Sequence, residues 1–277
     1  MVYLKILLTN DDGVLSPGLV AAARALSTRH AVYVVAPEAQ LSGIGAARTY
    51  TRPIRLSRVW AVGLYNNVEA YAVDGTPADA VFMGVKLFKP DLVVSGVNVG
   101  ENIGLESIYI SGTLGAAIQA ALMGVHALAL SVEAPPSLKF TQPQLSLDYF
   151  QQAASIALSL IDAASERGWP RGVDVISVNM PRPDRWRGGF VVTVNLAERI
   201  YDEELIEGKD PRGGTIYWRW GGVLSSLSED SDAYQLYYRS MLVVTPINVR
   251  LLEAIGDEAV REVEALVREA LMRVTKP

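Results

Sequence analysis

The first half of the chain alternates short, unbroken apolar runs with segments of helical period, and this rhythm restricts the fold more than any other feature. Unbroken apolar runs bounded by turn residues are typical of strands buried on both faces. The strand-like runs are residues 4–8, 32–35, 92–94 and 127–132, and the helical segments are residues 19–26, 78–87 and 113–123. Strands that alternate with helices in this way predict an α/β fold with a parallel sheet covered on both faces.

The pattern changes after Glu133. Residues 145–164 have a helical period, and residues 173–178 and 241–245 resemble strands. Residues 182–222 are rich in Gly, Arg and Trp and contain strand-like pieces at 190–194 and 215–220, which suggests an extended β-hairpin arm. Residues 251–271 form an amphipathic C-terminal helix in this interpretation. We therefore expect a core over residues 1–181, followed over residues 182–277 by the arm, a returning strand and the helix. Residues 50–72, around Asn66-Asn67, are expected to form a strand-rich excursion within the core.

Composition narrows the classes of function. The 277 residues are 50% hydrophobic and carry a formal net charge of −5, so a sizeable core is expected and stable binding to a nucleic-acid polymer or an anionic membrane surface is not. The chain has no cysteine, which excludes disulfides and thiolate metal sites. Residues 112–132 are long and apolar enough to consider a membrane span, but Gln119, Gly124 and His126 divide them into a helix and a strand. A cytoplasmic location is the default expectation.

Two adjacent carboxylates, Asp11 and Asp12, follow the first expected strand. A pair of carboxylates at a strand end suits a hard divalent cation, which prefers oxygen ligands. The alternative is structural, since the pair also fits a turn ahead of the helix start at Ser16-Pro17. Taken alone, the pair leaves both interpretations open.

Three further loops carry polar residues at the same expected edge of the sheet, where ligands collect in open α/β folds. Ser42 and Gly43 lie in a Gly/Ser loop that fits either an anion contact or an ordinary surface loop. Asn98 and Asn102 lie in a glycine-spaced loop after the strand at residues 92–94, and Ser111-Gly112-Thr113 begins a helix, as either a phosphate seat or a plain N-cap. The segment from Asp74 to Asp79 is interpreted as a capped helix start. Together the loops complement a cation that holds a phosphate.

With these segments taken together, the sequence resembles the SurE family of nucleotidases. The matching stretches are residues 9–13, 42–43, 74–79, 95–104 and 109 with 111–113, and the similarity continues through residues 178–181, 210–213 and 244–246. The resemblance implies a Rossmann-like core with a β-hairpin arm and a C-terminal helix, assembled as a homodimer or homotetramer through the arm and helix. It also implies a Mg²⁺- or Mn²⁺-dependent phosphatase that converts nucleoside monophosphates, 5′ or 3′, to nucleoside and phosphate.

Carried over by position, the resemblance assigns roles to individual residues. The metal ligands are Asp11, Asp12, Ser42 and Asn98, and the phosphate-contacting residues are Asn102, Ser111, Gly112 and Thr113, with Gly43 beside Ser42. The expected catalytic residues are Asp11, Asp12, Asn102 and Ser111. Two departures are Ile110, inserted between Tyr109 and Ser111, and Leu105-Glu106 in place of a commoner acidic pair. The rival hypothesis is a non-catalytic nucleotide- or metal-binding module on the same fold.

Overall fold

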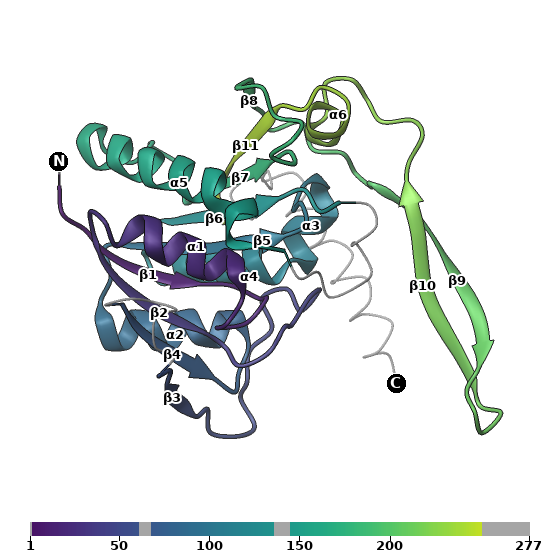
Figure 1. The fold of residues 1–277 in the computed structure, drawn as a ribbon, viewed down its shortest axis with the longest axis horizontal. Helices are drawn as coiled ribbons and strands as arrows, with labels where there is room; N and C mark the ends of the chain where they lie inside the picture. The colour runs from purple at the N-terminus through teal and green to yellow at the C-terminus, as the bar shows by residue number, and fades with distance from the viewer. Residues whose placement is uncertain (1, 61–67, 136–144, 251–277) are drawn as a thin grey trace, which may run out of the picture. The chain divides into compact units, whose positions relative to one another are not determined.

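A computed structural model describes residues 2–60, 68–135 and 145–250, and a nine-stranded sheet forms its centre (Figure 1). Six strands run parallel in the spatial order β4-β2-β1-β5-β6-β7. Their bounds are β1 (Lys5–Thr9), β2 (Ala31–Pro37), β4 (Glu69–Val73), β5 (Leu92–Val99), β6 (Ala127–Val132) and β7 (Val175–Met180). The predicted α/β class with a largely parallel sheet is confirmed.

Shorter or antiparallel strands complete both edges of this sheet. Strand β3 (Leu56–Arg58) pairs antiparallel with β4 at one edge. At the other edge β11 (Leu242–Ile247) pairs antiparallel with β7, and β8 (Phe190–Val192) pairs parallel with β11. The chain after residue 181 thus adds two strands to the sheet that the first half begins.

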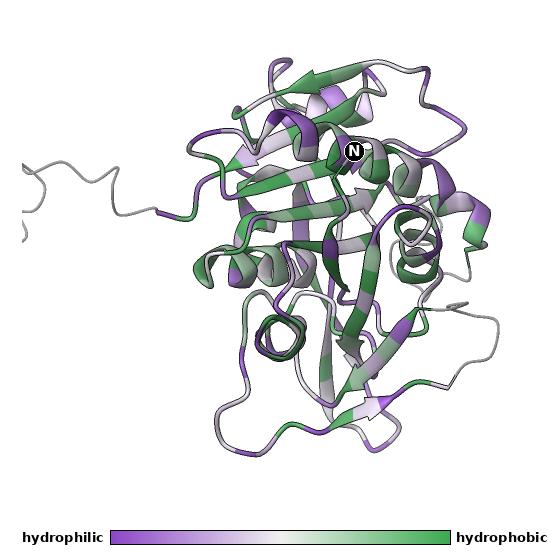
Figure 2. Ribbon diagram, turned by 90° about the vertical axis from the view of Figure 1, so that its left-hand side faces the viewer, coloured by the Kyte–Doolittle hydropathy of each residue, from purple (hydrophilic) through white to green (hydrophobic). Residues whose placement is uncertain are grey.

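Helices cover both faces of the sheet, as the sequence predicts. Helices α1 (Pro17–Leu26) and α5 (Leu147–Arg167) pack together, and so do α2 (Pro77–Phe88) and α4 (Gly112–Leu122). Alternation along β1 sorts its side chains between the two layers. Ile6 and Leu8 join the core cluster that includes α1, whereas Leu7 packs beneath Gly84 of α2. The sheet strands are accordingly mostly hydrophobic in Figure 2.

Two short helices were not predicted. Helix α3 (Gly104–Ile110) and helix α6 (Asp232–Tyr237) are seven and six residues long, too short to express a helical period in the sequence. Ile103, the residue before α3, packs with Ala233 and Leu236 of α6 in a small second core. This second core brings the loop after β5 next to the segment that precedes β11.

The hairpin arm is shorter than expected. It consists of β9 (Tyr201–Lys209) and β10 (Thr215–Val223), paired antiparallel from Tyr201↔Val223 to Lys209↔Thr215. The first strand-like piece of the expected arm is instead β8, which belongs to the main sheet. Strand β9 escaped prediction because five of its nine residues are charged. The expected C-terminal helix and the Asn66-Asn67 turn lie outside the described residues.

Residues 112–132 divide into α4 and β6, as the interrupting polar residues predicted. Among the residues that the structure describes, none of the helices has the length and apolar character that crossing a bilayer requires.

The strand order reverses at β1, where the chain builds first toward β2 and β4 and then toward β5, β6 and β7. Loops that follow strands on either side of such a reversal diverge and leave a crevice at the carboxyl ends of the strands. The loops after β1 and β5 meet there, and these are the loops that carry the aspartates and the asparagines.

Candidate active site

The turn after β1 is shaped by a buried asparagine that was not assigned a role from sequence. The Asn10 side chain accepts a hydrogen bond from the Gly13 backbone N–H at 3.2 Å and donates to Ser16 Oγ at 2.6 Å. Gly13 has a φ of 100°, which favours glycine. This closed turn fixes the direction in which Asp11 and Asp12 leave the strand.

The two aspartates are held by different neighbours. Asp11 is 5% exposed and accepts a hydrogen bond from Thr113 Oγ1 at 2.5 Å. Asp12 accepts from the Val99 backbone N–H at 3.1 Å and from Gln40 Nε2 at 3.4 Å. The pair therefore links three loops, those after β1, β2 and β5, to the first turn of α4.

The electrostatic state of the pair follows from its burial. Removal from water raises the pKa of Asp11 to about 6, although the hydrogen bond from Thr113 opposes the rise. Burial also raises the pKa of Asp12 to about 7, and the neighbouring Asp11 charge raises it further. Two buried carboxylates of like charge without a neutralising partner are costly, and a positive ion between them removes that cost.

Asn98 and Ser42 lie in segments that contact Asp12 through their neighbours Val99 and Gln40. The β5–β6 register shifts between Ser95 and Asn98, and such an irregularity re-aims a side chain at the end of a strand. Asn98 Nδ2 donates to the Gly100 carbonyl at 2.7 Å, which leaves its amide oxygen available as a ligand. Ser42 is exposed, and its Oγ accepts a hydrogen bond from Gln40 Nε2 at 3.0 Å. Gln40, missed in the sequence, thus bridges Ser42 and Asp12.

The start of α4 faces the aspartates. Ser111 is its N-cap, and Ser111 Oγ accepts a hydrogen bond from the Leu114 backbone N–H at 3.1 Å. A Cβ on Gly112 would lie 2.7 Å from the Asp11 Cβ, so only glycine permits this approach. The backbone N–H groups of Gly112 and Thr113, in the first turn, have no acceptor among the described residues. The helix start is thus a capped terminus, and its two N–H groups are of the kind that binds anions at helix starts.

Gly43 and Asn102 lie near this arrangement in different ways. Gly43 is exposed with a φ of 71° and has open space around it. Asn102 lies four residues after Asn98, but its side chain donates to Ser131 Oγ on β6 at 2.9 Å and bonds neither aspartate. Among the expected site residues, then, the direct hydrogen bonds join Asp11 to Thr113, whereas Gln40 joins Asp12 to Ser42.

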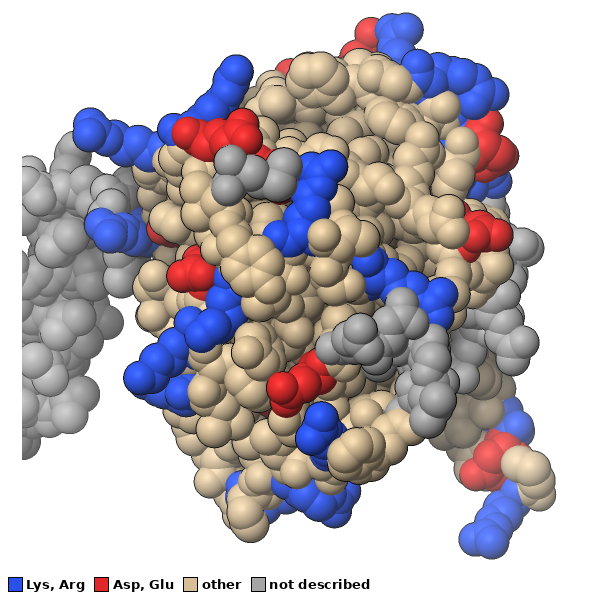
Figure 3. All heavy atoms as spheres, turned by 60° about the vertical axis from the view of Figure 1, so that its left-hand side comes forward, with Lys and Arg blue, Asp and Glu red and all other residues tan. Residues whose placement is uncertain are grey.

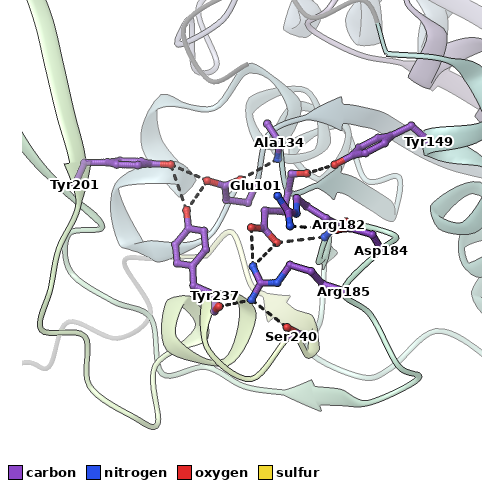
Figure 4. Close-up of polar contacts among 10 residues, drawn as sticks. Glu101, Ala134, Tyr149, Arg182, Asp184, Arg185, Tyr201, Tyr237 and Ser240 are labelled. Atoms are coloured by element: carbon purple, nitrogen blue, oxygen red, sulfur yellow. Dashed lines mark hydrogen bonds and ion pairs between the residues drawn. The ribbon is translucent and has the colours of Figure 1, made fainter. Parts of the chain in front are cut away.

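Glu101, between Gly100 and Asn102, points toward Tyr201 and Tyr237 at the base of the arm (Figure 4). Its carboxylate accepts hydrogen bonds from the hydroxyls of Tyr201, the first residue of β9, and Tyr237 of α6. Burial, together with the Glu101 charge, raises the pKa of Tyr237, which therefore stays a neutral donor. The asparagine loop is consequently tied to the arm by a charge-assisted contact.

A second carboxylate, Glu133 at the end of β6, extends this cluster. Arg185 donates to both Glu133 oxygens, at 3.0 and 3.3 Å, and also donates to Ser240 Oγ at 3.0 Å (Figure 4). The Tyr149 hydroxyl donates to the Glu133 carbonyl at 2.6 Å. With its charge balanced by an arginine, Glu133 stabilises the junction between β6 and α6.

The donors around Asp11 and Asp12 fit a hard divalent cation. The pair provides two carboxylates, and Asn98 and Ser42 would add neutral oxygens, which are donor types that Mg²⁺ and Mn²⁺ prefer. No group of three or more His, Cys, Asp or Glu residues gathers anywhere in the described part of the chain. An ion held here would therefore rely on oxygen donors with few charges.

Comparison with known proteins identifies the family. The model of the family described as survival protein SurE matches residues 6–202. The chain belongs to the SurE family. It is 43% identical over 238 residues to the 5′-nucleotidase SurE 2 of Pyrobaculum aerophilum, which covers 85% of this chain and 86% of that protein. It is 37% identical to the 5′-nucleotidase SurE of Methanocella arvoryzae, over 96% of this chain and 98% of that protein.

A solved SurE structure shares the fold. The crystal structure of the SurE protein from Aquifex aeolicus superimposes with a TM-score of 0.73 at 29% identity, covering 95% of this chain and 99% of that one. The resemblance stated from the sequence is confirmed by both comparisons. The residues matched by the family model include the loops after β1, β2 and β5.

Proposed function

We propose that this protein is a metal-dependent 5′-nucleotidase that releases inorganic phosphate from nucleoside monophosphates. The observation that carries the proposal is the Asp11-Asp12 pair, with Asp11 buried, Asp12 half-buried and Asp11 bonded to Thr113 at the start of α4. Relatives that cover most of the chain bear the name 5′-nucleotidase, which agrees with it. Attack on 3′-monophosphates belongs to the same proposal.

In this proposal Asp11, Asp12, Ser42 and Asn98 hold the cation, Mg²⁺ or Mn²⁺. A bound cation supplies Lewis-acid polarisation of a phosphoryl oxygen and a lower pKa for water. One of the two aspartates also orients the attacking water and takes its proton. These roles require both carboxyls to be ionised. Because burial raises the pKa of each carboxyl, their ionisation depends on the bound cation.

The phosphate is held by the start of α4. The backbone N–H groups of Gly112 and Thr113 and the positive end of the helix dipole stabilise charge on the phosphoryl oxygens. Ser111 and Asn102 face the leaving oxygen of the sugar, where a donor stabilises the developing alkoxide. The Ser42-Gly43 loop closes the opposite side of the phosphate.

The alternative of a non-catalytic binding module is less favoured. A protein that only binds nucleotides gains little from two buried carboxylates beside a phosphate seat, because like charges repel. A hydrolase needs the pair to hold its cation.

Figure 3 also shows Lys and Arg interspersed with Asp and Glu on the face in view, with no continuous basic stripe there that a nucleic-acid polymer would need.

The proposal extends to assembly. One face of the arm exposes large apolar side chains, because Trp218 and Trp220 alternate along β10 and Ile206 is the register partner of Trp218; their exposed fractions are 65%, 48% and 43%. Exposed apolar patches of this kind mark protein interfaces. We include in the proposal a homodimer or homotetramer that uses residues 182–277, with residues 1–181 as the catalytic core. Sedimentation of the wild type and Trp218→Lys tests this part, because loss of the apolar contact should lower the assembled mass.

The catalytic proposal is tested by phosphate release from a panel of nucleoside 5′- and 3′-monophosphates with Mg²⁺, with Mn²⁺ and with EDTA. Asp11→Asn should lose activity by about a thousandfold or more, while Asp148→Asn, an exposed carboxylate on α5, should keep it. Release that needs the cation and the Asp11 carboxylate supports the proposal. Folded protein that binds nucleotide and releases no phosphate under any metal condition would favour the binding module.

A further inference from the structure

A buried asparagine on β7 holds the backbone of Asn102. Asn179 is 1% exposed, and its Oδ1 accepts a hydrogen bond from the Asn102 backbone N–H at 2.7 Å. Its Nδ2 donates to the Asn102 carbonyl at 3.2 Å and to Ser177 Oγ at 3.3 Å. The Asn179 side chain therefore bonds both the backbone N–H and the carbonyl of Asn102, although the two residues are 77 positions apart in the sequence.

The neighbouring strand holds the side chain of the same residue. Ser131 on β6 is the register partner of Asn179 on β7 and is 3% exposed. Its Oγ accepts a hydrogen bond from Asn102 Nδ2 at 2.9 Å. Because one hydrogen of Asn102 Nδ2 is directed to Ser131, the amide plane has a defined orientation, and the second Nδ2 hydrogen has no acceptor among the described residues.

The loop needs these contacts because its own backbone is permissive. Gly100 and Gly104 flank Asn102 with φ values of 103° and 76°, in the region that favours glycine. A second anchor lies at the far end, where Asp232 accepts a hydrogen bond from the Gly104 N–H at 2.6 Å. Between the two glycines, the only side chains that bond Asn102 in the described structure are those of Asn179 and Ser131.

Packing gives no reason for polar residues at these two positions. The strand ends of β6 and β7 are fully buried, where apolar residues contribute more to stability than unbonded polar ones. An amide and a hydroxyl are favoured there only if they bond to something specific, and their shared partner is Asn102. The arrangement is that of an orienting shell around a functional side chain.

We infer that Asn179 and Ser131 are positioning residues that hold the Asn102 amide so that its second Nδ2 hydrogen is directed to the leaving oxygen of the substrate. The inference rests on the proposed nucleotidase function, within which Asn102 contacts substrate and these two residues act through it. Misplacing a group of this kind by about 1 Å lowers the rate by up to roughly a hundredfold, so the effect is large enough to measure.

A double-mutant cycle on Asn102 and Ser131 separates positioning from mere packing. Ser131→Ala should lower kcat for a nucleoside 5′-monophosphate about tenfold with KM changed little, and Asn102→Ala should lower it further. In the Asn102→Ala background, Ser131→Ala should have no additional effect, because its only target is gone. Effects that multiply in the double variant would overturn the inference. Ser95→Ala is the matched control, since it removes an equally buried hydroxyl that has no hydrogen-bond partner in the described structure.

A measurement that does not depend on activity tests the same contact. Hydrogen exchange at the Asn102 amide should accelerate at least about tenfold in Asn179→Leu and stay unchanged in Ser95→Ala, because Asn179 is the acceptor for that N–H. Unchanged exchange in folded Asn179→Leu would overturn the inference. Fast exchange and a non-additive cycle support it. Absence of phosphate release by the wild type would instead count against the proposed function, while the exchange result would still decide whether the loop is held.

Discussion

Replacing Asp12 by asparagine should stabilise the metal-free protein while removing its response to metal. The carboxylate is largely buried beside Asp11, and both effects raise its pKa from 3.8 to about 7. Asparagine has the same shape and can still accept the hydrogen bond from the Val99 N–H, and the Gln40 amide can turn to accept from the new Nδ2. The substitution therefore removes a charge and keeps the local contacts.

The magnitude follows from the shift in pKa. A carboxyl whose pKa is raised in the folded state contributes stability below pH 3.8, where both states are protonated, and loses it as the pH rises through about 7. Three units at about 1.4 kcal/mol each set a ceiling near 4 kcal/mol, and partial contact of Asp12 with water reduces the cost to roughly 2 to 4 kcal/mol. For a chain of this size each kcal/mol moves Tm by about 2 to 4 °C.

The assay is thermal or denaturant unfolding in EDTA at about pH 4 and about pH 8. Asp12→Asn should exceed the wild type by roughly 2 to 4 kcal/mol at the higher pH and equal it at the lower one. Excess Mg²⁺ or Mn²⁺ should then stabilise the wild type, by about 2.7 kcal/mol at a hundred times Kd, and leave the variant nearly unchanged. Asp148→Asn, on the surface of α5, should show neither effect. An Asp12→Asn variant less stable than wild type at pH 8 in EDTA would refute the reasoning.

Three further outcomes are expected. Gly112→Ala places a Cβ 2.7 Å from Asp11 Cβ and should weaken Mn²⁺ binding at least about tenfold by calorimetry, whereas Gly222→Ala, which has open space, should not. Because protons compete for carboxylates with raised pKa values of about 6 and 7, Mn²⁺ affinity should fall roughly tenfold per unit below pH 7 and more steeply below pH 6, and a flat profile would contradict this. Asp79→Ala removes a capping box and the acceptor of the Thr49 N–H, so urea unfolding should show a free energy of unfolding lower by about 2 kcal/mol. A decrease below about 0.5 kcal/mol would argue against the cap.

The parts of the fold that sequence predicts are those with a local signal. The apolar run of β6 and the helical period of α4 are local, and the polar residues between them mark the division. The meeting of the Asp11 and Asn98 loops also follows from sequence, because parallel strands share one carboxyl edge. Thr76 and Asp79 form the capping box that their spacing predicts.

Features that depend on distant partners escape such reasoning. Asn179 is one of two polar residues in the strand Val175–Met180, and nothing local indicates that its partner lies 77 residues earlier. Gln40 looks like any surface loop residue until the folded chain places it between Asp12 and Ser42. Strand β9 is stabilised by pairing with β10 and carries little apolar alternation of its own.

The contacts that hold the asparagine loop join residues far apart in the sequence. The parts of the crevice therefore fold in a defined order as the chain leaves the ribosome. Synthesis delivers Asp11, Asp12 and the start of α4 early, and these can meet as soon as β1, β5 and α4 have folded together. The loop carrying Asn102 waits for Asn179, and its far end waits for Asp232, which lies 128 residues after Gly104. A partly synthesised chain therefore has the carboxylates for a cation before it has the held asparagine, and the crevice gains its final geometry only when nearly the whole protein is made.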